Sequence, residues 1–192
     1  MANYEYILAS LPEITSDSTG VSDAESVIGE IRSQLDGKDL TEMLLLDSYF
    51  SEEGPGKEFY LKARASGCRF TREYFEYDRT VRNAKVTYLN GRLGRPEGTD
   101  ILLLGEEEEL PSCPEAEDAL GRSDLIEREK ALDDLMWAKA DELTCLDILD
   151  LDLIIAFIIK LKIADRWMKL DAEKGRALLR KLVDEIRNSN KI

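Results

Sequence analysis

Histidine is absent from the chain, although the sequence has 192 residues. Ser-His and Cys-His nucleophile pairs, histidine general bases and the Glu-x-x-His motif of di-iron proteins all need this residue. The sequence therefore excludes these catalytic classes. Carboxylate and lysine chemistry survive in principle, so each group of acidic residues has to be weighed by itself.

Cysteine is scarce as well. Cys68, Cys113 and Cys145 lie far apart, are odd in number and show no CxxC spacing. Neither a disulfide framework nor a zinc site is indicated by this pattern. We expect reduced thiols, no metal and no cofactor.

Long apolar runs are also missing. The longest, Leu153 to Ile159, is cut by Lys160, whereas a membrane span needs about 20 apolar residues. Residues 1–12 carry Glu5 and no basic cluster before their short apolar run, unlike a secretory signal. We expect a cytoplasmic protein with no direct membrane span.

Acidic charge is abundant. Forty acidic and twenty-six basic residues leave a net charge of -14. Residues 100–152 alone hold eighteen acids and four bases, so the net charge of this segment equals that of the whole chain. Because such a charge repels phosphate backbones and anionic membrane surfaces, nucleic acid is an unfavourable partner. The asymmetry is suited to docking on a basic protein surface.

Helical periodicity and end signals predict an all-α fold. Capping patterns begin at Ser22, Asp39 and Asp124, and Gly94 with Pro96 marks a stop. Tyr4 to Leu11 is rich in aromatic and β-branched residues, so a short N-terminal extended segment is predicted there. The predicted helices cover about residues 22–37, 39–53, 70–93, 124–146, 151–170 and 171–187.

The same pattern predicts two small helical lobes. Residues 1–95 form the N-terminal lobe, 96–122 an acidic loop or linker rich in glycine and proline, and 123–192 a C-terminal three-helix lobe. The segment from Leu153 to Ile163 is apolar nearly all round, which is typical of a helix enclosed by its neighbours. The predicted helix 124–146 has one apolar stripe, made by Leu125, Leu132, Leu135, Met136, Leu143 and Leu146.

Two groups of residues could carry chemistry, and each has a structural alternative. Asp147, Asp150 and Asp152 have a spacing that suggests a cation site, but the glycine and closing glutamate of an EF-hand loop are missing. Capping of the next helix is the favoured interpretation. Gly91 and Gly94 lack the lysine-serine pair of a phosphate loop, which favours helix termination.

Trp137 and Trp167 are single large aromatic residues on predicted helices. Core packing is the favoured role for both, and anchoring of an interface is the alternative.

Long stretches of the chain resemble a known family. They are YEYILASLP near the start, FTREYFEYDRTVRNAKVTYLNGRLG in the middle, and LIEREKALDDLMWAKADELTCLDIL and LDLIIAFIIKLKIADRWMKLDAEKGRALLRKLVDEI toward the end. They resemble an uncharacterised bacterial family, a domain of unknown function associated with V-type (A/V-type) ATPase operons and regarded as equivalent to the C-type subunit of that enzyme. The resemblance covers most of the chain outside residues 13–38 and 96–122.

This resemblance implies a helical, non-catalytic rotor component seated between the central-stalk subunits and the membrane proteolipid ring of a proton- or sodium-translocating ATPase. It implies no nucleotide site, no small-molecule substrate and a location peripheral to the inner membrane. C-type subunits are longer and are built from three similar helical units, whereas this chain shows no repeat that can be aligned. No catalytic residue can be carried over, because the family has none.

Two exposed surfaces are predicted to contact partners, an acidic loop and a basic helix face. Their residues are Glu106, Glu107, Glu108, Glu109, Arg72, Arg79 and Arg82. For the glutamates, a solvated charge run without a partner is the alternative. Two other functions stay open: a free-standing acidic helical adaptor unrelated to the ATPase, and an enzyme that depends on buried carboxylates or a bound ion.

Overall fold

The structure, a computed structural model, describes residues 4–16, 23–105 and 111–170. Within these ranges the chain forms eight α-helices and no strand, which confirms the predicted all-α class. The helices are α1 Tyr4–Ser10, α2 Ala24–Ser33, α3 Gly37–Tyr49, α4 Lys57–Arg64, α5 Arg69–Leu93, α6 Pro114–Leu120, α7 Leu125–Thr144 and α8 Leu151–Leu170.

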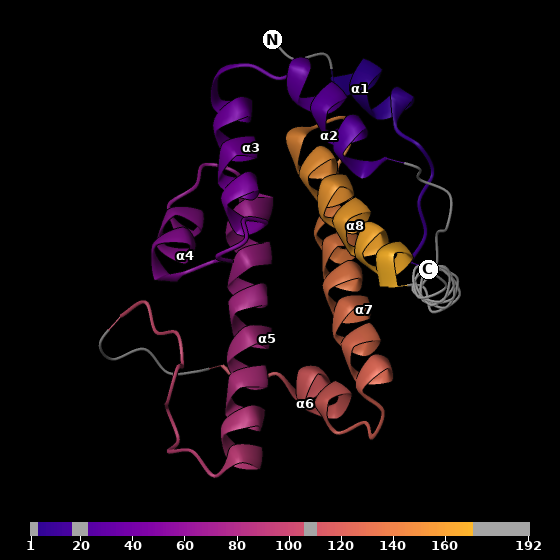
Figure 1. The fold of residues 1–192 in the computed structure, drawn as a ribbon. Coiled ribbons are helices and arrows are strands. Elements are labelled where there is room, and N and C mark those ends of the chain that lie inside the picture. Colours follow the sequence, from indigo (N-terminus) through magenta and orange to yellow (C-terminus); the bar gives the residue numbers. More distant parts are fainter. Residues whose placement is uncertain (1–3, 17–22, 106–110, 171–192) are drawn as a thin grey trace, which may run out of the picture.

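The longest helix, α5, runs through the molecule beside the pair formed by α7 and α8 (Figure 1). α7 and α8 are antiparallel, since Lys160 pairs with Asp141 and Arg166 with Asp133. α3 and α4 flank one end of α5, α6 packs between the other end of α5 and α7, and α1 and α2 lie against α8. No described helix combines the length and apolar character that crossing a membrane requires.

Local signals explain where several helices begin and end. The carboxylate of Asp124 accepts hydrogen bonds from the backbone amides of Ile126 at 2.8 Å and Glu127 at 2.9 Å, as the predicted cap requires. The cap of α2 is Asp23, which accepts from the Ser26 amide at 3.2 Å. Gly94 ends α5 with φ of 64°, a left-handed conformation that favours glycine. This confirms helix termination over a phosphate loop at this position.

One hydrophobic core joins the helices of both predicted lobes. α8 supplies its centre, with Ile154, Ile155, Ile158, Ile159 and Leu161 all buried, as its nearly continuous apolar sequence predicted. α5 packs on α7 and α8, and α2 also contacts α8. Helices from both predicted lobes share this core. That the two lobes are separate folding units therefore stays a prediction.

Two expectations about local structure are wrong. The N-terminal stretch is not extended but forms α1, because Ile7 is buried in the core beside α8 and tertiary packing overrides the strand propensity. Part of the expected linker is α6, which buries Ala116, Ala119 and Leu120. Pro114 looked like a breaker, yet proline is well suited to the first helical turn. The predicted helix 171–187 lies outside the described residues.

The predicted apolar stripe of α7 is right in the middle and wrong at both ends. Leu132, Met136 and Leu143 are buried, whereas Leu125 and Leu146 are exposed. Leu125 is the first residue of α7, and the helix stops at Thr144, before Leu146. The helical spacing therefore predicts nothing about Leu146, which lies beyond the end of the helix.

Candidate functional site

The three arginines of the predicted basic face of α5 differ in exposure. The side chain of Arg79 is only 1% exposed, so its prediction as an exposed contact residue is wrong. Arg82 is half-buried, and Arg72 is exposed. The other predicted surface, Glu106 to Glu109, lies outside the described residues. Whether Arg72 or Arg82 contacts a partner stays a prediction.

Arg79 is buried because it fastens the segment after α5 to that helix. Its Nη1 donates a hydrogen bond to the Leu102 carbonyl at 3.0 Å, and its Nη2 pairs with Glu76. Asn83 holds the same backbone unit, donating to the Leu102 carbonyl at 3.0 Å and accepting from the Leu102 amide at 2.9 Å. Asn90 donates to the Thr99 carbonyl at 2.7 Å. These polar side chains replace the backbone bonds that an irregular segment lacks.

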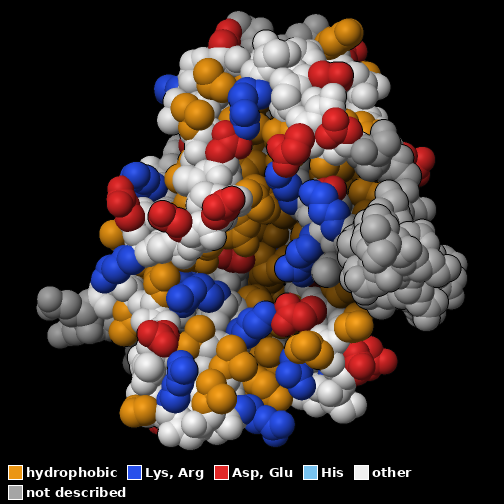
Figure 2. All heavy atoms as spheres, viewed as in Figure 1, with side chains coloured by type: hydrophobic (Ala, Val, Ile, Leu, Met, Phe, Trp, Pro, Cys, Tyr) orange, Lys and Arg blue, Asp and Glu red, His pale blue; other side chains and the backbone are white. Residues whose placement is uncertain are grey.

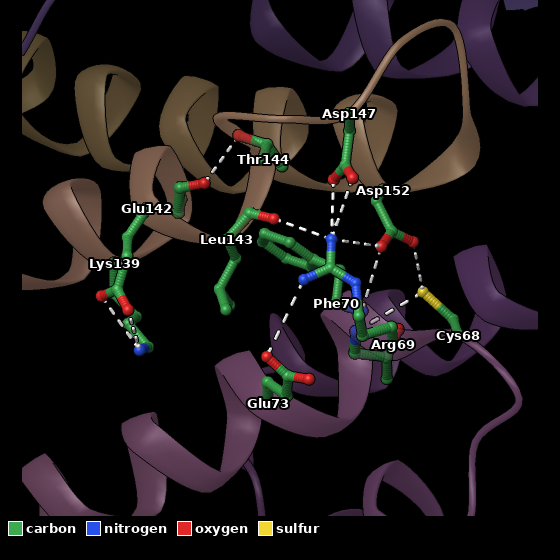
Figure 3. Close-up of polar contacts among 12 residues, drawn as sticks. Cys68, Arg69, Phe70, Glu73, Lys139, Glu142, Leu143, Thr144, Asp147 and Asp152 are labelled. Carbon is green, nitrogen blue, oxygen red and sulfur yellow. Dashed lines mark hydrogen bonds and ion pairs between the residues drawn. The ribbon is translucent and has the colours of Figure 1, made fainter.

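The acidic cluster at the junction of α7 and α8 is assembled as its spacing suggested. Asp147, Asp150 and Asp152 place carboxylate oxygens within 4.8 Å of one another. Arg69 lies among these groups (Figure 3): its Nη2 is 2.9 Å from an Asp147 oxygen and 3.4 Å from an Asp152 oxygen. The same nitrogen donates to the Leu143 carbonyl at the end of α7, at 2.8 Å. One guanidinium therefore joins α5 to both helices of the pair.

Asp152 also holds the first turn of α5. Its Oδ2 accepts from the Phe70 amide at 3.3 Å, and its Oδ1 accepts from the Cys68 thiol at 3.1 Å (Figure 3). A carboxylate is favourable here because the first amides of a helix have no partner within the helix. Burial raises the pKa of Cys68 to about 12, so this thiol stays protonated and is a poor nucleophile near neutral pH.

Asp150 caps α8, as the favoured interpretation predicted. Its Oδ1 accepts from the Leu153 amide at 3.2 Å. Burial raises the pKa of Asp150, and the bond from Leu153 opposes that rise. The three aspartates are the described residues with the geometry to hold a divalent cation. Their present partners are a guanidinium, a thiol and backbone amides, so this arrangement acts chemically as an ion-paired helix junction.

Arg69 is the functional residue that the sequence analysis did not single out. A signal for it exists, because Arg69 is the first residue of α5 and a positive charge there opposes the helix dipole. Nearby carboxylates offset this unfavourable charge. Which carboxylates these are depends on a contact spanning 78 residues of sequence, from Arg69 to Asp147, and local patterns do not contain that information.

A hollow of about 390 Å³ lies between α3 and α5 on one side and α7 and α8 on the other. Tyr49, Phe50, Met136, Ile159 and Ile163 are among the residues that line it, with Lys162 and Arg166 on α8. Figure 2 shows the apolar floor of this furrow and basic side chains along its α8 side. These cations already have partners: Lys162 pairs with Glu25, and Arg166 with Asp133.

Both tryptophans are half-buried and take part in polar contacts at the α7–α8 pair. The Trp167 indole donates to Asp133 at 2.6 Å, and the Lys160 ammonium lies 5.4 Å from the centre of the Trp137 ring. Both residues thus join the two helices through polar contacts at the edge of the core, and the favoured core-packing role stays a prediction.

The fold and this junction define a helical protein whose charged clusters hold helices together. Residues 103–190 match the model of a family described as protein of unknown function (DUF2764). The matched segment contains α6, α7 and α8 and so includes Asp147, Asp150 and Asp152. No curated protein and no solved structure matches the chain. The match fits the expected resemblance to an uncharacterised family.

Proposed function

We propose that the protein is a non-catalytic component of a bacterial V-type (A/V-type) rotary ATPase, similar to its C-type subunit and coupling the central stalk to the proteolipid ring. One observation carries the proposal. The stretches on which the family resemblance rests become α1, α5, α7 and α8, and these helices pack on one another. A resemblance that falls on one packed unit supports a shared architecture better than scattered matches would.

The way the helices are joined supports a mechanical role. α5, with 25 residues, is about 37 Å long at 1.5 Å per residue. Lys85, in the second half of α5, pairs with Glu129 of α7 at 2.7 Å, and Arg69 fastens the first turn of α5 to the junction of α7 and α8. These two separated ion pairs resist sliding of α5 along its neighbours. Such a rigid bundle suits a part that transmits torque.

The polar groups of the junction also favour a non-catalytic role. General acid–base catalysis needs a group that can exchange a proton with substrate near the working pH. Here Arg69 and helix amides engage the carboxylates, and the Cys68 thiol has a pKa of about 12. With no histidine in the chain, binding of other proteins is the function that these residues support best.

The direct test is co-purification. A tagged copy of the chain is expressed in its own bacterium, membranes are solubilised, and the recovered proteins are identified by mass spectrometry. We expect the central-stalk and catalytic ATPase subunits in constant proportion. Recovery of the chain alone, together with normal ATPase assembly in a deletion strain, would contradict the proposal. Recovery of an unrelated basic protein would favour the free-standing adaptor instead.

A further inference from the structure

The loop between α7 and α8 displays apolar side chains that the fold does not use. Leu146 is 88% exposed, Ile148 81% and Leu149 46%. In the described part of the chain, the first two are the most exposed of the large hydrophobic residues. Because apolar side chains stabilise a protein by being removed from water, Leu146 and Ile148 contribute almost nothing to this fold. We refer to Leu146–Leu149 as the apolar loop.

The apolar loop is held at its base. The Asp147 amide donates to the Thr144 carbonyl at 3.1 Å, and the Asp147 carboxylate accepts two contacts from Arg69 Nη2, at 2.9 and 3.0 Å. The side chain of Asp147 is thus directed inward, between the two residues whose side chains are exposed. A loop fixed in this way loses little conformational entropy when a partner binds it.

Backbone strain marks the same loop. Leu149 has φ of 55°, in the left-handed region that a residue with a branched apolar side chain rarely adopts. The position is occupied by neither glycine nor asparagine, either of which would adopt this conformation at lower cost. Strained residues of this kind concentrate at functional sites, where the arrangement is retained for reasons other than stability.

Charge decides which partner fits. Glu73, Asp147 and Asp152 surround one arginine at the base of the loop (Figure 3). Asp150 lies beside these aspartates, so this surface stays negative. An anionic membrane surface would be repelled. We propose that the apolar loop is a docking tip that inserts Leu146 and Ile148 into an apolar pocket with a basic rim on a partner protein. This rests on the proposed function, which makes the partner a subunit of the ATPase.

The test uses the full chain and the ATPase solubilised from membranes of a deletion strain. Binding of the wild-type chain to the immobilised ATPase is compared with that of the double variant L146S/I148S. The matched control is L125S/I126S, which removes an adjacent pair at the opposite end of α7 that is also exposed, at 64% and 68%. Circular dichroism and urea unfolding establish that all three proteins are folded.

We expect Kd to rise about a hundredfold for L146S/I148S and less than about twofold for L125S/I126S. The reason is that only Leu146 and Ile148 become buried when the wild-type chain binds. Equal binding by wild type and L146S/I148S would overturn the docking tip and leave the proposed function standing. An equal loss in both double variants would also overturn it, since unspecific apolar adhesion would then explain the binding. Failure of the wild-type chain to bind would overturn both proposals.

Vesicles of phosphatidylcholine and phosphatidylglycerol provide the second arm. We expect no flotation of the wild-type chain with these vesicles. Flotation that is abolished in L146S/I148S would overturn the protein partner in favour of a lipid surface.

Discussion

Two groups of carboxylates on or beside α5 are held in opposite ways. At its first turn, Asp147 and Asp152 face Arg69, a full positive charge. Further along the helix, the carboxylate of Asp78 accepts from the hydroxyls of Tyr49 at 2.8 Å and Tyr60 at 2.7 Å. Asp147 and Asp152 are compensated by a directly paired charge, whereas the hydrogen-bond donors to Asp78 are neutral hydroxyls and the positive charge that acts on it comes from Arg82.

The arrangement around Asp78 makes the stability of the protein depend on pH. Burial raises the pKa of Asp78, and the tyrosine hydroxyls only partly offset the rise. A carboxyl whose folded pKa is raised contributes stability below its unfolded pKa and loses it as pH rises through the folded value. The contribution of Asp78 to the free energy of unfolding should therefore fall as the pH rises.

Substituting Arg69 should have the largest effect. R69A removes the guanidinium from three acceptors and leaves two carboxylates that are mostly buried, with side chains 16% and 14% exposed. Because Arg69 itself is part-exposed, we expect a loss of about 2 kcal/mol in the free energy of unfolding at pH 7.

Urea unfolding at pH 7 measures this loss for R69A. The control is R72A, one turn along the same helix, which should cost less than about 0.5 kcal/mol because Arg72 is exposed. Equal costs for the two variants would contradict the special role of Arg69.

Removing one tyrosine hydroxyl should have an intermediate effect. Y60F keeps the buried ring but takes one of the two donors from Asp78, and should cost about 1–1.5 kcal/mol at pH 7. The cost should be smaller at pH 4, where more of Asp78 is neutral. Thermal and urea unfolding at both pH values measure it. Y6F, at an exposed tyrosine, is the control and should cost less than Y60F.

Neutralising Asp78 should change the shape of the pH profile more than the stability itself. D78N removes the ionisable group and keeps an acceptor for one tyrosine hydroxyl, so the change at pH 7 should stay within about 1 kcal/mol. Relative to D78N, the wild type should lose stability as pH rises from about 4, just above the ordinary Asp value of 3.8, toward neutral. A wild-type protein that gains stability relative to D78N over this range would show that the sign is wrong.

The smallest effect should come from the apolar loop. L146S and I148S, taken singly, should change the free energy of unfolding by less than about 0.5 kcal/mol, because the side chains are almost fully exposed. Urea unfolding with L143S as the contrast checks this, since Leu143 is buried and its loss should cost several times more. A large loss in L146S would mean that the loop packs on the protein itself.

The sequence predicts the helices better than it predicts the contacts of their polar residues. The spacing of apolar residues located α5, α7 and α8, and Asp124 was identified as a cap. Arg79 was misjudged because its acceptor, the Leu102 carbonyl, lies in an irregular segment 23 residues away. The pairing of Arg69 with Asp147 is equally non-local. Such contacts depend on how helices pack, and helical periodicity records only which face is apolar.

The errors in secondary structure have the same origin. Aromatic and β-branched residues near Tyr4 favour a strand locally, but burial of Ile7 beside α8 stabilises a helix. Proline near α6 suggested a linker, although Pro114 occupies the first turn, where its missing amide costs nothing. In both places tertiary contacts decided between conformations that are locally close in free energy.

Electron cryo-microscopy of the ATPase, purified through a tag on a catalytic subunit, tests the central claim most directly. We expect this chain between the central stalk and the proteolipid ring, with Leu146 and Ile148 covered by a neighbouring subunit. A fully assembled ATPase in which another protein fills that position, with this chain absent from the preparation, would contradict the account.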